Sequence, residues 1–440
     1  MKNNFIIFFS SFNELDMILP FIDYVLTKYD DKVVLYSTER NIPGVDCHLE
    51  FLRTQHHLKS NFFFDEQCFR KYKNVLSFRD RIIRTWNKRR AKKKTIRYIS
   101  YIFSIIILII RRVIELFLEI PIGRFVDKQN YSDKIMVTVF SEGAFPNRAV
   151  VKIAEKRSIK TVAYDHGFFL YANLGNTNKS INMKSVRREI YKLISGKRYY
   201  CSSYITGNSH KDTWFRSNTI EDFKELDRVY EISTPRYTKE WVRIFRERLM
   251  NNKQFIYGDE NKLNVVFFLS RQHLNVNEME FINTLQKLSK IDNINFVYKP
   301  HTRGFDVIDE STINGFNASD VNSILLSAWA DVGIVFGSSI GLQLLLDNVP
   351  IIVPSYIHFN SYIIEKYKIC ITANSLEDLI TILSDNTKED IVKLIDNRKR
   401  DKFLNKFLEA NKSYKQIMKE YYEAVVDMDF VKCGMSVSYE

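Results

Sequence analysis

The sequence predicts an α/β protein with two Rossmann-like halves that face a cleft. Short, continuous apolar runs alternate with amphipathic stretches along most of the chain, which is typical of buried parallel strands separated by helices. This alternation restarts after a polar stretch at residues 251–262. With 440 residues, the chain is also longer than one ordinary compact core, so two domains are expected.

The first half begins with an apolar run that predicts a strand rather than a signal peptide, because the run is short and lacks a small-residue cleavage site. A helix is expected next at 15–29, and another at about 147–157. The strands predicted in this half share an uninterrupted apolar run and lie at 5–11, 32–38, 134–141, 161–167 and 203–209.

The second half repeats the pattern, with helices expected at 278–290, from the serines at 338–339 through 346, and at 375–385. Its predicted strands are again continuous apolar runs, at 264–270, 294–301, 332–339, 349–355 and 369–373. We therefore expect an N-terminal domain over 1–250, a linker at 251–262 and a C-terminal domain over 263–440 that ends in helices.

An insertion at about 79–122 concentrates the positive charge of a chain whose net charge is +13. Residues 79–112 hold twelve Lys or Arg and a single acid, Asp80, and they include the apolar run 98–110. Thirteen residues are too few to cross a bilayer, which needs about 20. A basic block beside an apolar run suits a segment lying on an anionic membrane surface. A buried helix with a solvated basic flank and a nucleic-acid contact are the alternatives, although no nucleic-acid module accompanies the charge.

Several classes of protein are disfavoured. The five cysteines are scattered without a C-x-x-C pair, which argues against a zinc or disulfide scaffold and fits a reducing compartment. Neither G-x-x-x-x-G-K-[ST] nor G-x-G-x-x-G occurs, which argues against an ATPase and a dehydrogenase. The acidic triplet at 427–429 lies far from the predicted strands, so we expect neither a metal nor a cofactor.

Polar residues and glycines follow the strands of both halves. In a doubly wound fold, the carboxyl ends of the strands face the ligand cleft. The candidate site residues at these ends are Glu142 and His166 in the first half, and Arg271, Lys299, His301, Arg303, Gly337, Ser338 and Ser339 in the second.

The serines at 338 and 339 stand where a helix is expected to begin. A helix N-terminus carries unpaired N–H groups and a partial positive charge, which together favour a phosphate. The cations Lys299, His301 and Arg303 belong to the same half and would face the same anion, neutralising a diphosphate leaving group. An ordinary serine N-cap is the alternative.

These motifs resemble a known family. The stretch "YKPHTRG", followed by "ADVGIVFGSSIGLQLLLDNVPIIVP", is similar to the second domain of GT-B glycosyltransferases that build bacterial surface polysaccharides. These include capsule and lipopolysaccharide transferases, sialyl- and polysialyltransferases, and CDP-glycerol glycerophosphotransferases. In those families a His-Pro pair and a Ser-Ser pair hold the nucleotide phosphates, whereas here Thr302 follows His301. The stretch "EISTPRYTKEW" resembles the segment that joins their two domains, and "SEGAF…TVAYDHGFF" resembles their acceptor side.

The resemblance implies that the first domain binds the acceptor and supplies a base. Sialyl- and polysialyltransferases carry an acid before a glycine, as at Glu142, and CDP-glycerol polymerases carry a His-Gly pair, as at His166. Either residue would take the proton of the acceptor hydroxyl, and a base with a pKa near neutrality suits this role. The sequence leaves the choice between them open.

The resemblance implies a metal-independent glycosyltransferase that moves a sugar from a nucleotide-activated donor to a growing cell-surface polysaccharide or lipid-linked glycan. We expect it to lie peripherally on the inner face of the cytoplasmic membrane, with no nucleic-acid partner. A CDP-polyol phosphotransferase, a non-catalytic membrane-associated assembly protein and a sugar-nucleotide epimerase are the alternatives. The donor base, sugar, linkage, acceptor and oligomeric state stay open.

Overall fold

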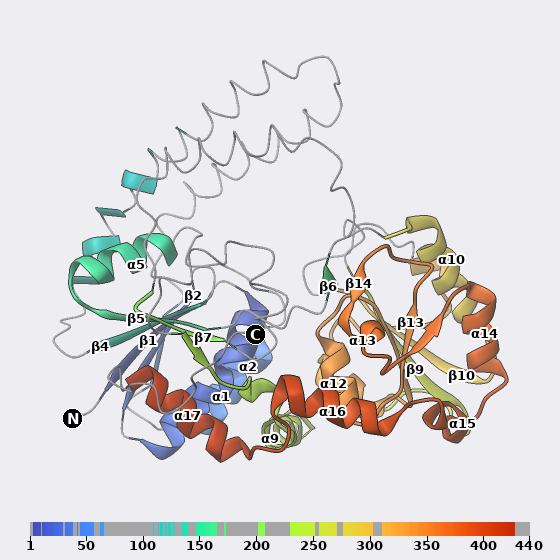
Figure 1. Ribbon diagram of the computed structural model, residues 1–440. Coiled ribbons are helices and arrows are strands. Elements are labelled where there is room, and N and C mark those ends of the chain that lie inside the picture. The colour runs from blue at the N-terminus through green and yellow to red at the C-terminus, as the bar shows by residue number, and fades with distance from the viewer. Residues whose placement is uncertain are drawn as a thin grey trace, which may run out of the picture.

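Two parallel sheets organise the chain in this computed structural model, one built before residue 232 and the other after residue 262 (Figure 1). The structure describes residues 3–9, 11–29, 31–37, 42, 45–56, 62–65, 109, 113, 115–117, 119–120, 122–124, 126–127, 134–139, 147–164, 171–172, 201–206, 229–250, 255–270, 276–301 and 310–426.

All strands of the first sheet are parallel and follow the order β3-β2-β1-β4-β5-β7-β8. This is the doubly wound order with one strand added at the β8 edge. Residues of β1 point alternately into two cores, with Phe5, Ile7 and Phe9 in one and Ile6 and Phe8 in the other. The strands are β1 (Asn4–Phe9), β2 (Lys32–Ser37), β3 (Phe62–Asp65), β4 (Lys134–Val139), β5 (Lys160–Tyr164), β7 (Ser203–Thr206) and β8 (Val229–Glu231).

The second sheet is also fully parallel, in the order β11-β10-β9-β12-β13-β15. The strand order reverses between β9 and β12, and doubly wound sheets bind ligands at such a point. The strands are β9 (Leu263–Phe268), β10 (Ile294–Lys299), β11 (Phe316–Asn317), β12 (Val332–Val335), β13 (Ile351–Pro354) and β15 (Ile371–Ala373).

Helices cover both faces of the first sheet. One face packs against α1 (Phe12–Lys28), α2 (Asp46–His56) and α17 (Tyr414–Val426), and the other against α5 (Asn147–Lys156). In the second half lie α10 (Glu278–Leu288), α11 (Ser323–Trp329), α12 (Ile340–Leu346), α13 (Ile363–Lys366), α14 (Leu376–Ser384), α15 (Lys388–Lys393) and α16 (Asn397–Leu408).

The chain crosses between the two halves twice. The first crossing runs through η1 (Pro235–Tyr237) and α9 (Lys239–Met250), and the second leads from α16 back to α17, which packs on α1 (Figure 1). The crossings contact each other, since the Ser233 amide donates to the Glu409 carboxylate at 3.2 Å. The helices predicted to end the second domain therefore divide between the two halves. The predicted linker packs on the second half, where its Phe255 ring lies 5.5 Å from the Phe316 ring.

Within the predicted insertion, the structure describes part of the segment 109–127, and every described residue in it is helical. Ile122 and Val126 are buried beneath α5, whereas Phe117 and Ile120 are 70% and 57% exposed. The apolar run 98–110, apart from Ile109, lies outside the described residues, so the alternative of a buried helix with a solvated basic flank stays a prediction. The basic stretch from 79 to 108 lies outside the described residues. Among those described, no helix combines the length and apolar character that crossing a membrane requires.

The predicted element positions are close to the observed ones. Strands β1, β2, β9 and β10 end one or two residues before their predicted ends. Strand β12 ends four residues before its predicted end at 339. Sequence analysis does not predict β3, β8 and β11, which are short, nor α2, α9 and α11.

Candidate functional site

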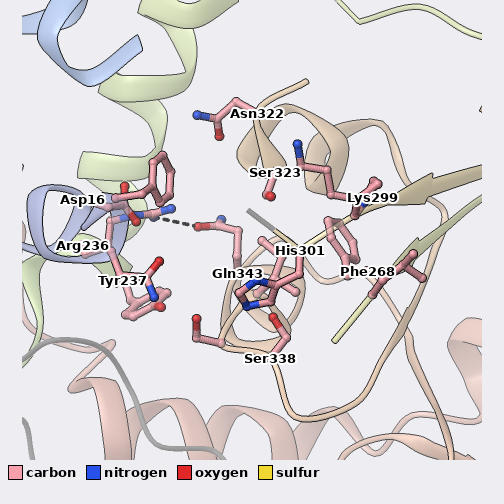
Figure 2. Close-up of a pocket in the computed structure, with 16 residues that line it drawn as sticks. Asp16, Arg236, Tyr237, Phe268, Lys299, His301, Asn322, Ser323, Ser338 and Gln343 are labelled. Carbon is pink, nitrogen blue, oxygen red and sulfur yellow. Dashed lines mark hydrogen bonds and ion pairs between the residues drawn. The ribbon is translucent and has the colours of Figure 1, made fainter. Parts of the chain in front are cut away.

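A cavity of about 120 Å³ lies between the two halves, at the carboxyl ends of β9, β10 and β12 (Figure 2). The first half contributes Phe12, Asn13 and Asp16 from the first turns of α1, and η1 contributes Arg236 and Tyr237. The cavity therefore occupies the switch point of the second sheet and is closed from the other side by α1.

The second half lines the cavity with the ends of its strands and the starts of two helices. His301 follows β10, Ser338 and Ser339 precede α12, and Asn322 and Ser323 begin α11. These side chains are half-buried. They form what we call the strand-end wall, and Figure 2 shows His301 beside Ser338 on it.

Gly337 allows the chain to turn from β12 into this wall. Its φ is 61°, a left-handed conformation that costs a residue with a Cβ roughly 1 kcal/mol or more. Ser339 takes the N-cap position of α12, but its side chain makes no capping hydrogen bond. The alternative of an ordinary serine N-cap is therefore wrong for Ser339.

Lys299 lies at the wall but directs its hydrogen bonds elsewhere. Its Nζ donates to the carbonyl oxygens of Ala318 at 2.9 Å and Ser319 at 2.5 Å. In Figure 2 the amino group lies toward Asn322 and Ser323. Burial lowers the pKa of Lys299 to about 8, so the group is still mostly charged at neutral pH. The ammonium thus adds positive charge to the cavity while holding the end of β10.

Asp16 is bonded from two sides. Its Oδ1 accepts a hydrogen bond from His48 Nε2 at 2.8 Å, and its Oδ2 accepts one from Arg236 Nε at 2.6 Å. Burial alone would raise the pKa of Asp16, but the charges of Arg236 and His48 outweigh it and lower the pKa to about 2. Burial would also lower the pKa of His48, but Cys47 and Asp16 raise it to about 9.

The same bonds continue into the second half. Arg236 Nη1 donates to Gln343 Oε1 at 3.2 Å, and Gln343 Nε2 donates to Asp347 Oδ2 at 3.1 Å. Arg246 of α9 donates to the same Asp347 oxygen at 2.6 Å. We call this set the junction network, and its members are Asp16, His48, Arg236, Arg246, Gln343 and Asp347.

A second contact joins the halves beside the strand-end wall. Strand β6 (Tyr171–Ala172) of the first half pairs antiparallel with β14 (Ser361–Tyr362) of the second. The Tyr362 hydroxyl donates to the Ser338 carbonyl at 3.1 Å. The chain that leaves β5 therefore reaches the cavity wall.

The predicted site residues divide into two groups. Lys299, His301, Ser338 and Ser339 line the same cavity, and Gly337 adjoins it. Their role as nucleotide ligands stays a prediction. The other four, Glu142, His166, Arg271 and Arg303, lie outside the described residues. Strands β4 and β5, which precede Glu142 and His166, are parallel neighbours in the first sheet.

Sequence reasoning does not find Asn13, Asp16 or Gln343. A signal exists for Gln343, because it is the one polar side chain within the helix "IGLQLLL". Arg236 lies in the quoted joining segment, but no local pattern reveals that its partner is Asp16. Among the described residues, no group of three or more His, Cys, Asp or Glu is placed to hold a metal ion.

No protein-family model and no curated protein sequence matches the chain. Solved structures do. TcCGT1 in complex with UDP aligns over 97% of this chain and 99% of its own, with a TM-score of 0.53 and 12% identity. The glycotransferase of kitacinnamycin aligns over the same shares, with a TM-score of 0.51 and 10% identity. The UDP-GlcNAc 2-epimerase from Neisseria meningitidis aligns over 96% and 99%, with a TM-score of 0.48 and 10% identity.

The fold is GT-B. This confirms the predicted fold of two Rossmann-like domains, and identities this low show the fold alone. The cavity lies between the two Rossmann-like domains, at the carboxyl ends of the strands of the second domain. It combines a cationic residue, an imidazole and hydroxyl groups with an adjoining set of ion pairs, a composition suited to a polar, anionic ligand.

Proposed function

We propose that this GT-B protein is a glycosyltransferase that uses a nucleotide-activated sugar. The observation that carries the proposal is the strand-end wall, where His301, Ser338 and Ser339 gather with the Lys299 charge at the switch point of the second sheet. Cations and hydroxyl donors at this place suit the diphosphate of a sugar nucleotide. TcCGT1, which shares the fold, was solved in complex with UDP.

The chemistry we propose is an in-line displacement. A base on the first domain removes the proton of the acceptor hydroxyl, whose oxygen attacks the anomeric carbon while the bond to the nucleotide phosphate breaks. Glu142 or His166 is the proposed base. We propose that Arg271 and Arg303 join Lys299 and His301 in neutralising the departing phosphate, so that no metal is required.

The acceptor we propose is a growing cell-surface polysaccharide or a lipid-linked glycan, with the protein bound peripherally to the inner face of the cytoplasmic membrane. The sequence resemblance to surface-polysaccharide transferases and the twelve cations of residues 79–112 support this proposal.

A nucleotide screen followed by turnover tests the proposal. The melting temperature should rise with one of CMP, CDP, UDP, GDP or dTDP, because a ligand that binds only the folded form stabilises it. Donor hydrolysis should then release a free sugar, whereas a released polyol phosphate would indicate the phosphotransferase instead. Glu142→Gln or His166→Ala should cut turnover by roughly 10²–10⁴-fold with donor binding retained. Glu389→Gln on the exposed side of α15 is the control, and inertness toward every nucleotide would overturn the proposal.

A further inference from the structure

The segment 109–127 has two chemically different faces. Glu115, Glu119, Ile122 and Val126 follow the spacing i, i+4, i+7 and i+11, which places them on one side of a helix. Ile109, Val113, Leu116, Phe117 and Ile120 follow the spacing i, i+4, i+7, i+8 and i+11, which places them together on another side. We call these the inner face and the outer face.

The inner face is fixed to α5. Glu115 bonds to Arg148, and Lys152 Nζ donates to Glu119 at 2.5 Å. Further along, Arg157 makes two hydrogen bonds to the Asp127 carboxylate, at 2.5 and 2.8 Å. Ile122 and Val126 are buried in the core beneath the first sheet (the cyan ribbon pieces beside α5 in Figure 1). These contacts set the rotation of the segment, so the outer face is turned away from the domain.

The outer face is apolar and exposed. Its side chains are 45–70% exposed, with Phe117 the most exposed of them. The acids of the segment are paired with two bases of α5 and with Arg157, which follows α5, so their charges are largely neutralised there. Arg124, which is also exposed, adds a cation near the end of the segment. An apolar row without acids of its own is the surface that a lipid bilayer accepts.

We propose that the outer face inserts into the interfacial layer of an anionic lipid membrane. This inference adds to the proposed function by naming the surface that binds the membrane. It rests on the proposed function only for the identity of that membrane, which is the one on which the glycan is assembled. Residues 79–112, with twelve cations and one acid, lead directly into the outer face along the chain. Anionic headgroups attract such a stretch while the acyl region receives the apolar row.

A second copy of the chain is a less suitable occupant. Five half-exposed side chains present on the order of 400 Å² of apolar surface, about half of what one partner contributes to a standard interface. Two copies joined through this face would also bring together their two basic stretches, which repel each other. An anionic lipid surface would instead attract the basic stretch of each copy.

Vesicle binding tests the inference. Full-length protein should sediment with vesicles of equimolar phosphatidylcholine and phosphatidylglycerol, and less with phosphatidylcholine alone. Phe117→Glu combined with Ile120→Glu should weaken binding roughly 100-fold or more, because two apolar side chains no longer leave water. Binding that remains should be more sensitive to salt. The matched control is Ile256→Glu with Met279→Glu, which alters two exposed apolar residues, 78% and 83% exposed, on the other domain.

A second variant reports insertion directly. Phe117→Trp should add fluorescence that shifts to shorter wavelength with anionic vesicles and is quenched by brominated acyl chains, whereas Met279→Trp should add none that responds. Wild-type sedimentation with no effect of the paired glutamates and no quenching at position 117 would overturn the inference. So would a dimer that the paired glutamates dissociate without vesicle binding. Nucleotide thermal shifts are measured on the same proteins. A shift without vesicle binding overturns this inference and the proposed membrane location but leaves the proposed glycosyltransferase activity standing. Vesicle binding without a shift overturns the proposed activity and leaves this inference standing.

Discussion

The two sides of the cavity differ in how deeply their polar side chains are buried. In the junction network, His48 and Gln343 are fully buried and Arg236 is 6% exposed, and all are bonded to partners within the protein. On the strand-end wall, His301 and Ser338 are half-buried and border the open cavity. We therefore expect two tasks at one site, with one side holding the domains together and the other contacting a ligand. Mutations on one side should therefore change stability, and mutations on the other should change binding.

The largest effect should follow from Arg236→Ala. Removing this guanidinium leaves Asp16 with one partner fewer and Gln343 Oε1 without its donor, and breaking a buried ion pair typically costs about 3–5 kcal/mol. Denaturant unfolding should show this loss in the free energy of unfolding. Arg243→Ala is the control, because its pair with Glu247 on α9 is exposed and contributes little. Equal stability of the two variants would contradict the assignment of the network as the structural side.

A smaller effect should appear on the alkaline side of neutrality. The pKa of His48 is raised to about 9 from its usual 6.5, so its stabilising contribution is complete below pH 6.5 and is lost as the pH rises through about 9. The free energy of unfolding should fall by up to about 3 kcal/mol over this range, since each pKa unit corresponds to about 1.4 kcal/mol. His48→Gln should flatten that part of the profile. A wild-type profile that is already flat would contradict the raised pKa of His48.

The smallest effect belongs to the strand-end wall, and it should appear in binding alone. His301→Ala, and Ser338→Ala combined with Ser339→Ala, should each weaken nucleotide binding by about one to two decades, or about 1.5–3 kcal/mol. Calorimetric titration measures this loss, and unfolding should be nearly unchanged. Ser384→Ala, on an exposed helix end, is the control. Lower stability with unchanged affinity would reverse the comparison of the two sides.

The strands that build this wall could be predicted from the sequence because their signals are local. A buried parallel strand is one continuous apolar run, and the change to polar residues marks its end within one or two positions at β9 and β10. Gly337, at a φ of 61°, marks the turn that follows. The sequence alone therefore predicts that His301, Ser338 and Ser339 share one site.

The junction network could not be predicted, because its contacts are distant in sequence. Asp16 and Arg236 lie 220 residues apart, and nothing near either residue names the other. Lys299 shows that the type and position of a residue can also suggest a partner that the folded chain does not provide. Its type and place suggested a ligand for phosphate, but the path of the chain after β11 puts two carbonyl oxygens within reach of its Nζ. The hydrogen-bond acceptors of such a cation can be identified only in the folded structure.

The meeting of the two domain crossings limits how the domains can move. Ser233, on the first crossing, bonds to Leu408 and Glu409 on the second crossing. Both connecting segments therefore pass through one place. Beyond it, α17 is tied to the first domain by the Tyr422 hydroxyl, which donates to Asp31 at 2.6 Å. Two chain connections that pass through one place favour bending about that place over sliding of one domain along the other. We therefore expect any change in the width of the cavity to take the form of a hinge at Ser233 and Glu409.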